Sequence, residues 1–251
     1  HKPDRRQRQM CIRDRDKIRK PPDQEAKKAI DNLINLGCTL QETREILTHE
    51  IDWRIKCGAR IIVSTPREDI GASMLIAEDL SPKVDVPVEV VPMEELEKVL
   101  SNSSNGTIVT SRYFLQPLEK VAKQHGVRAI AVDLSDFQKE LKILKELSAG
   151  SCVGIVSISP GLLRAAEVII HSMRGSDLML MTAISDNNSR LLSLLKTSNH
   201  IVCDWPSLSV VENTLLKNRS QLIRLPQIIC AKNYLSIETI NQLKKEIGII
   251  N

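Results

Sequence analysis

Small polar side chains follow four of the short apolar runs in this sequence. At the carboxyl ends of parallel strands, hydroxyl groups and helix N-termini with free N–H groups suit a small polar or anionic ligand. A guanidinium among them would add a bidentate contact to a carboxylate or phosphate. The candidate ligand-binding residues are Ser64, Thr65, Thr110, Ser111, Arg112, Ser157, Ser159, Gly161 and Asp204.

Each of these residues also has a purely structural explanation. Ser, Thr and Asp are good N-caps of helices anywhere in a protein. Arg112 can pair with an acidic neighbour instead of a ligand. For any one of these stretches we prefer the structural explanation. Taken together, four such stretches at strand ends also fit a shared ligand cleft.

Signatures of catalysis and metal binding are missing from the sequence. It has no Gly-rich dinucleotide fingerprint, no phosphate-binding loop and no nucleophile elbow. The pair His49-Glu50 lacks the second His of a zinc helix, and no two of the six cysteines form a Cys-x-x-Cys pair. We therefore expect no enzyme, no metal and no cofactor.

Composition indicates a globular protein with an aliphatic core. Apolar residues make up 42% of the 251 residues and aromatic residues only 2%, which favours Leu, Ile, Val and Ala between helices and parallel strands. No apolar run reaches the roughly 18 residues of a membrane span, and no signal peptide is apparent. Free cysteines within apolar runs are typical of a reducing compartment, so we expect a cytoplasmic protein.

The basic character of the chain is confined to its first 20 residues. They hold nine Lys or Arg and three Asp or Glu, whereas the remaining residues carry 26 basic and 28 acidic side chains. The stretch Arg5–Arg15 resembles a DNA-binding arm in composition, but it is aperiodic and is separated from the rest by Pro21-Pro22. We interpret residues 1–22 as a disordered, non-native tail and linker, such as a translated adapter, and the chain as a fragment.

Residues 23–58 are predicted to form a helical hairpin. Gly37 ends the first helix, and Thr39-Leu40-Gln41-Glu42 is a capping box for the second. The second helix has two apolar stripes. Either both are buried within one chain, or one contacts the following domain or a second subunit. The stripes are Leu40, Leu47, Ile51 and Ile55, and Ile46, Trp53 and Cys57; the candidate dimerisation residues are Leu47, Ile51, Trp53 and Ile55.

From residue 59 onward, short β-branched runs alternate with helical patterns, which predicts an α/β fold with parallel sheet. Eight strand–helix units could form a (β/α)8 barrel, but such a barrel usually has roughly 250 residues and this region has only about 190. We expect one doubly wound sheet or two Rossmann-like lobes, the lobes being 59–133 plus 222–251, and 134–221. The predicted strands are Arg60–Ser64, Val88–Val91, Thr107–Thr110, Arg128–Val132, Cys152–Ser157, Leu178–Met181, His200–Cys203 and Leu222–Cys230.

Four stretches of the chain resemble the C-terminal region of GntR-type transcriptional regulators, in the long form found in cyanobacteria. The resemblance runs from about Pro22 to the C-terminus and is specific as a set, although none of its stretches is a catalytic motif. It implies a dimerising hairpin, an effector-binding α/β region and an N-terminal winged helix that binds DNA. The stretches are GCTLQETREILTHEIDWRIKCGARIIV, GTIVTSRYF, SPGLLRAAEVIIHSMRG and LPQIICAKNY.

The resemblance and the residues together predict a transcription regulator. We expect this chain to be its dimerising, effector-sensing region, a homodimer that binds DNA only through a winged helix that the given sequence lacks. The effector would be a small polar or anionic molecule. The alternatives are an α/β enzyme for a small anion or a solute-binding module, with Arg112 as the anion clamp.

Overall fold

The computed structural model describes residues 22–134 and 137–248. These residues divide into two compact units, one that ends at Trp53 and one that begins at Arg54. The prediction of a non-native tail concerns residues 1–21, which lie outside the described ranges. Pro22, which we had placed in that tail, instead begins a helix, because the first helical position needs no N–H bond and suits the fixed φ of proline.

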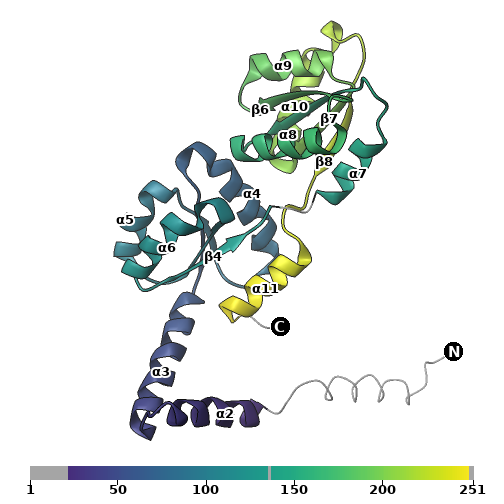
Figure 1. Cartoon of the computed structure of the whole chain (residues 1–251). Helices are drawn as coiled ribbons and strands as arrows, with labels where there is room; N and C mark the ends of the chain where they lie inside the picture. The colour runs from purple at the N-terminus through teal and green to yellow at the C-terminus, as the bar shows by residue number, and fades with distance from the viewer. Residues whose placement is uncertain (1–21, 135–136, 249–251) are drawn as a thin grey trace, which may run out of the picture. The chain divides into compact units, whose positions relative to one another are not determined.

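The two helices predicted for residues 23–58 are α2 (Pro22–Asn35) and α3 (Leu40–Cys57). Figure 1 shows them at a wide angle to each other, and no residue of α2 is buried, so the predicted packing of the two helices as a hairpin is not observed. The capping box is confirmed. The Glu42 N–H donates to the Thr39 hydroxyl over 3.2 Å, and the Thr39 N–H donates to the Glu42 carboxylate over 2.7 Å. This backbone hydrogen bond lowers the pKa of Glu42. The start of α3 is therefore fixed by residues within one turn of each other.

Neither apolar stripe of α3 is buried along its length. Leu40, Ile51 and Ile55 of the first stripe are 71%, 56% and 70% exposed, and Ile46 of the second is 45% exposed. The alternative that both stripes are buried within one chain is therefore wrong for the described residues. The other two candidate dimerisation residues, Leu47 and Trp53, are half-buried.

The second unit contains two four-stranded sheets, so the prediction of two α/β lobes is confirmed. All strand pairs in both sheets are parallel. Each of the eight predicted strands overlaps an observed one. The first lobe contains β1 (Ile61–Val63), α4 (Ile70–Leu80), β2 (Val88–Val90), α5 (Leu96–Asn102), β3 (Thr107–Ser111), α6 (Leu115–Gln124), β4 (Arg128–Val132) and α11 (Ile237–Ile247). The second contains α7 (Gln138–Glu146), β5 (Cys152–Ser157), α8 (Pro160–Arg174), β6 (Met179–Ile184), α9 (Asn188–Thr197), β7 (His200–Asp204), α10 (Trp205–Lys217) and β8 (Gln227–Ala231).

The first lobe has the strand order β2-β1-β3-β4. Alternate residues of β1 enter different cores, as the twofold period of a strand requires. Ile61 and Val63 pack in a cluster with residues of α4 and α11, whereas Ile62 packs with residues of α5 and α6. Helices therefore cover both faces of this sheet, which explains the uninterrupted apolar run of β1.

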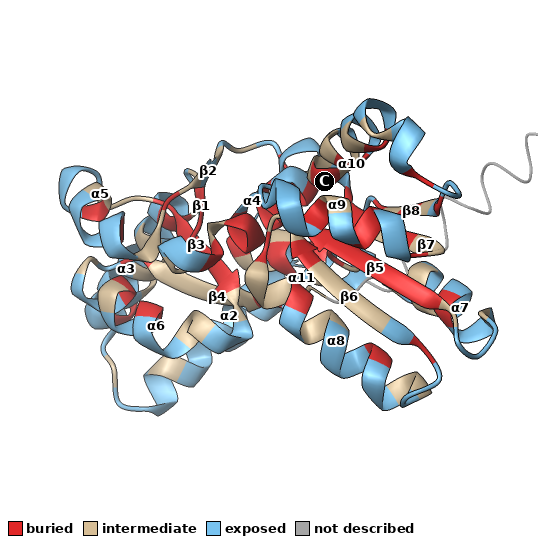
Figure 2. Ribbon diagram, turned by 90° about the horizontal axis from the view of Figure 1, so that it is seen from above, coloured by how far each residue is buried: buried red, intermediate tan, exposed pale blue. Residues whose placement is uncertain are grey.

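The second lobe repeats this arrangement with the order β6-β5-β7-β8. Its central strand β5 is buried at every residue (Figure 2). Val153 and Ile155 pack against α7 and α8, and Val156 packs against α9 and α10. The same physical pattern thus produces two similar layered lobes from sequences with no evident repeat.

The chain crosses between the lobes twice. The first crossing follows β4, as predicted near Asp133. The second crossing was predicted at the start of residues 222–251, which we assigned to the first lobe, and this boundary is wrong. β8 pairs with β7 in the second sheet, so the chain returns only after Ala231. The sequence could not reveal this, because an apolar strand fits the edge of either sheet equally well.

Candidate functional site

The carboxyl ends of β1 and β3 carry the first group of candidate residues. Ser64, Thr65 and Thr110 are fully buried. The Thr65 hydroxyl donates to the Asp69 carbonyl oxygen over 2.8 Å and lies 2.8 Å from the Ser73 hydroxyl. Within the described ranges, the hydroxyls of Ser64, Thr110 and Ser111 have no hydrogen-bond partner. Thr65 therefore has a structural role, whereas the other hydroxyls are available to a ligand only if the surrounding packing opens.

Arg112 is engaged at the surface of the first lobe. Its Nε donates to Asp133 Oδ1 over 3.1 Å and its Nη2 donates to Asp133 Oδ2 over 2.5 Å. The hydrogen bond and the charge of Asp133 raise the pKa of Arg112. The fork geometry that would clamp an anion is thus already occupied by a carboxylate of the same chain.

The candidate residues of the second lobe form one hydrogen-bonded network around Asp204. Its Oδ2 accepts the Ser157 hydroxyl over 2.6 Å and the Ile158 N–H over 2.9 Å. Its Oδ1 accepts the Ser207 N–H over 2.9 Å, which caps α10. The Ser157 hydroxyl in turn accepts the Ser159 N–H over 3.0 Å. Asp204 therefore orders the loop between β5 and α8.

A residue that we did not predict, Asp69, joins this loop to the first lobe. The Ser159 hydroxyl donates to Asp69 Oδ1 over 2.6 Å, and the Gly161 N–H donates to the same oxygen over 3.1 Å. Asp69 and Ser159 are both buried. The carboxylate lies at the N-terminus of α8, the position that favours negative charge. Asp69 thus fills, from within the chain, the place where an anionic ligand of the second lobe would bind.

Two glycines allow the lobes to approach this closely. A Cβ atom at Gly161 would overlap the Asp69 carboxylate, and one at Gly71 would overlap the Ile158 carbonyl group. Both contacts join residues of different lobes. Gly161, a candidate ligand-binding residue, is therefore required for close packing at this position.

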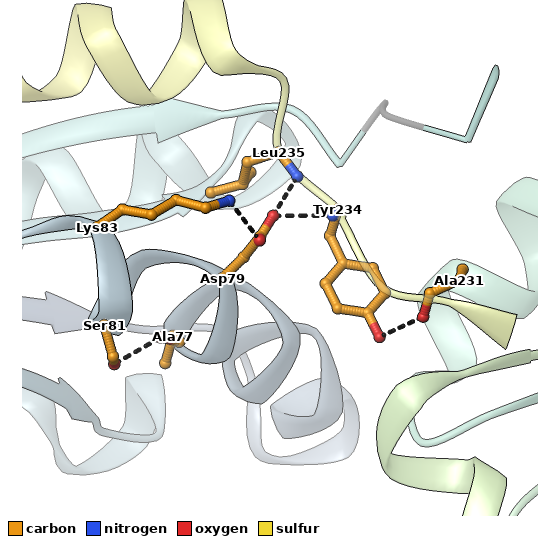
Figure 3. A network of polar contacts seen from close by, with 7 residues as sticks. All are labelled: Ala77, Asp79, Ser81, Lys83, Ala231, Tyr234 and Leu235. Carbon is orange, nitrogen blue, oxygen red and sulfur yellow. Dashed lines mark hydrogen bonds and ion pairs between the residues drawn. The ribbon is translucent and has the colours of Figure 1, made fainter. Parts of the chain in front are cut away.

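The second crossing is fixed by another buried carboxylate, Asp79 of α4 (Figure 3). Its Oδ2 accepts the Tyr234 N–H over 2.8 Å and the Leu235 N–H over 2.7 Å. Its Oδ1 pairs with Lys83 Nζ at 2.7 Å. The Tyr234 hydroxyl donates to the Ala231 carbonyl oxygen over 3.1 Å, and burial raises the pKa of this phenol. The segment from Ala231 to Leu235, where the chain crosses between the lobes, is thus held at both ends.

Apolar side chains pack around these polar contacts at the junction. Leu75 of α4 and Tyr234 pack in one cluster with Ala231, and Leu134, Phe137, Ile158 and Leu162 contact it. The junction therefore combines a buried apolar cluster with two buried carboxylates. Opening a cleft here would expose apolar surface and break charge-assisted hydrogen bonds.

Glu78, at the same junction, predicts a dependence of stability on pH. Desolvation raises its pKa, and the charges of Asp204 and Asp79 add to the effect. A carboxyl whose pKa is raised on folding contributes stability below its unfolded pKa, and that contribution is lost as the pH rises through the folded pKa. Glu78→Gln should therefore increase the free energy of unfolding at pH 7, measured by urea denaturation, with a gain that vanishes below about pH 4.5.

The exposed Glu119 of α6 provides the control for that measurement. Glu119→Gln should leave the urea midpoint unchanged between pH 4 and pH 7. An equal gain for both variants would show that overall charge, rather than the position of Glu78, determines the effect.

The described residues contain no group of three or more His, Cys, Asp or Glu that would hold a metal ion. Within the same ranges, no helix combines the length and the hydropathy that a membrane crossing requires.

The comparisons with known proteins agree with this description. Residues 139–232 match the family model of the C-terminal domain of cyanobacterial PlmA-type GntR regulators. No curated protein matches the chain. The matched residues begin in α7 and end just after β8, so they cover the second lobe. The resemblance that the sequence predicted is confirmed there: residues 139–232, less than half of the chain, are similar to the C-terminal domain of the PlmA-type GntR regulators.

Proposed function

We propose that the chain is the dimerising and effector-sensing region of a GntR-type regulator of transcription and that it catalyses no reaction. The observation that supports this most strongly is the match of the second lobe to the C-terminal domain of such regulators. The junction is consistent with a sensor, because its two carboxylates and two glycines give the lobes one defined packing. A ligand that favours a different packing would change the relative position of the lobes.

A second copy of the chain is the proposed partner of α3. The exposed stripe of Leu40, Ile51 and Ile55 runs along the helix, and α2 leaves it uncovered. Two pairs of helices that pack through such stripes bury them in a four-helix bundle. In a regulator, a dimer of this kind places two DNA-binding domains to contact the two halves of a symmetric operator.

The double variant Ile51→Lys/Ile55→Lys tests this proposal. Charged side chains in the apolar interface should weaken the dimer by at least about 100-fold, because burying unpaired like charges costs several kcal/mol. Sedimentation equilibrium over a micromolar concentration range measures the effect. We expect the unmodified chain to sediment as a dimer and the variant as a monomer.

Asp52→Lys is the matched control, since Asp52 is exposed on α3 between the two apolar stripes. It should leave the dimer intact. If the unmodified chain is a monomer throughout this range, or if both variants weaken association equally, dimerisation through this stripe is disproved.

The proposal of an anion-binding enzyme or solute-binding module gains no support from Arg112. Its guanidinium is paired with Asp133 on an exposed surface, and this pair explains its presence. An arginine clamp would instead present its fork to the ligand.

A further inference from the structure

The second lobe contains a cavity that the side chains described above do not fill. It lies between α7 and α8, above the carboxyl ends of β5 and β7, and has a volume of about 90 Å³. Residues 155–157 of β5 and 202–204 of β7 line its floor. From these neighbouring strands the sheet continues in opposite directions, to β6 and to β8. Such a switch point is where ligands bind in open α/β sheets.

The walls of the cavity explain why it is not filled by the protein itself. Ala165 and Ala166 of α8 face it with small side chains, and Leu141 and Leu144 of α7 lie opposite. α7 has only nine residues, so few side chains can reach into the space. An unfilled apolar cavity destabilises a lobe in proportion to its volume, and a ligand that fills it recovers that loss.

The polar groups around the cavity restrict what can bind. Its charged lining residues are Glu140 and Asp204, both acidic. The Asp204 carboxylate already accepts three hydrogen bonds from Ser157, Ile158 and Ser207. Burial raises the pKa of the Cys203 thiol, so this group is neutral. An anion would be repelled here, and three of the roughly four acceptor sites of the Asp204 carboxylate are already used within the chain.

We propose that this cavity is a binding site for a compact, uncharged aliphatic molecule, or for the aliphatic end of a longer one. A volume of about 90 Å³ is smaller than the ~150 Å³ apolar cavity that holds benzene. In proportion to the six carbon atoms of benzene, a branched chain of about three or four carbon atoms is the appropriate size. A longer ligand would extend out of the cavity between α7 and α8, where Ile169 lines the cavity and is 45% exposed.

Ligand in this cavity would act on the junction between the lobes. Phe137, Leu162 and Ala231 line the cavity and also belong to or contact the junction cluster that contains Leu75. Ser157 lines the cavity and holds the N–H of Ser159, whose hydroxyl binds Asp69. This regulatory consequence rests on the proposed sensing function, whereas the binding itself does not.

Titration with two molecules of the same carbon skeleton tests the binding. 2-Methylpropan-1-ol is uncharged, and 2-methylpropanoate carries a carboxylate. NMR spectra of the full chain with labelled Ile, Leu and Val methyl groups report contacts in the cavity through Leu144, Ile155 and Val202. We expect the alcohol to shift these methyl signals along a saturating curve, while the carboxylate at equal concentration leaves them in place.

Two substitutions establish the position of the site. Ala166→Leu fills the cavity and should weaken binding of the alcohol at least ~10-fold, while Ala26→Leu, at an exposed position of α2, should leave it unchanged. If Ala166→Leu does not fold, the smaller change Ala165→Val replaces it. The proposal is overturned if the alcohol causes no saturating shift, if the carboxylate binds as tightly, or if the filled variant binds as well as the original. A dimeric chain that fails to bind the alcohol refutes the cavity site alone, and a monomer that binds it refutes the dimerisation proposal alone.

Discussion

Replacing Asp79 by alanine should lower the free energy of unfolding by about 3–5 kcal/mol, because two buried N–H groups lose a charged acceptor and such hydrogen bonds contribute about 1.5–3 kcal/mol each. The substitution leaves the N–H groups of Tyr234 and Leu235 without their acceptor and Lys83 without its counterion. All three are close to the second crossing, where little water can replace the lost carboxylate. Urea denaturation of the purified chain measures the effect.

Lys83→Met separates the two roles of Asp79. Lys83 is 35% exposed at its side chain, so the ion pair contributes little, and the variant keeps both backbone hydrogen bonds. We expect a loss below about 1 kcal/mol. If Lys83→Met lowers the free energy of unfolding as much as Asp79→Ala does, the ion pair makes the main contribution to stability. The two backbone hydrogen bonds to Asp79 would then contribute little.

Replacing Asp69 by alanine should release the loop between β5 and α8 from the first lobe. The Ser159 hydroxyl and the Gly161 N–H lose a shared, charged acceptor at the N-terminus of α8. Hydrogen bonds to charged groups contribute about 1.5–3 kcal/mol each to stability, and we expect a total loss in that range because water enters the opened site. Urea denaturation gives the free energy, and amide hydrogen exchange should accelerate at Gly161.

Asp133→Ala is the control for Asp69, since it also removes an aspartate that pairs across a distance in the sequence. Its partner Arg112 has a side chain that is 74% exposed, so the loss should be at most about 1 kcal/mol. Exchange at Gly161 should stay slow in this variant. Unchanged exchange in Asp69→Ala would show that the apolar cluster around Leu75 alone holds the lobes together.

The candidate site was only partly predictable. The sequence identified Ser157, Ser159 and Asp204 as polar residues at strand ends, and the structure brings these three together. It did not identify Asp69 or Asp79, because an aspartate near a helix has the same local pattern whether it caps a turn or joins two lobes. Ser159 lies 90 positions from Asp69, and nothing in the residues around either one indicates the pairing.

The sequence by itself determined the local structure of this protein: the two N-terminal helices, the capping box of the second, the eight strands and the alternation of strands and helices. These features depend on residues within a few positions of one another, through hydrogen bonds of one turn and the periods of apolar side chains. Only the tertiary structure decided that β8 belongs to the second sheet, that Asp69 occupies the N-terminus of α8, and that Ala165 and Ala166 face a cavity. Each depends on contacts between segments far apart in the chain, and their free energies follow from burial and distance rather than from residue type.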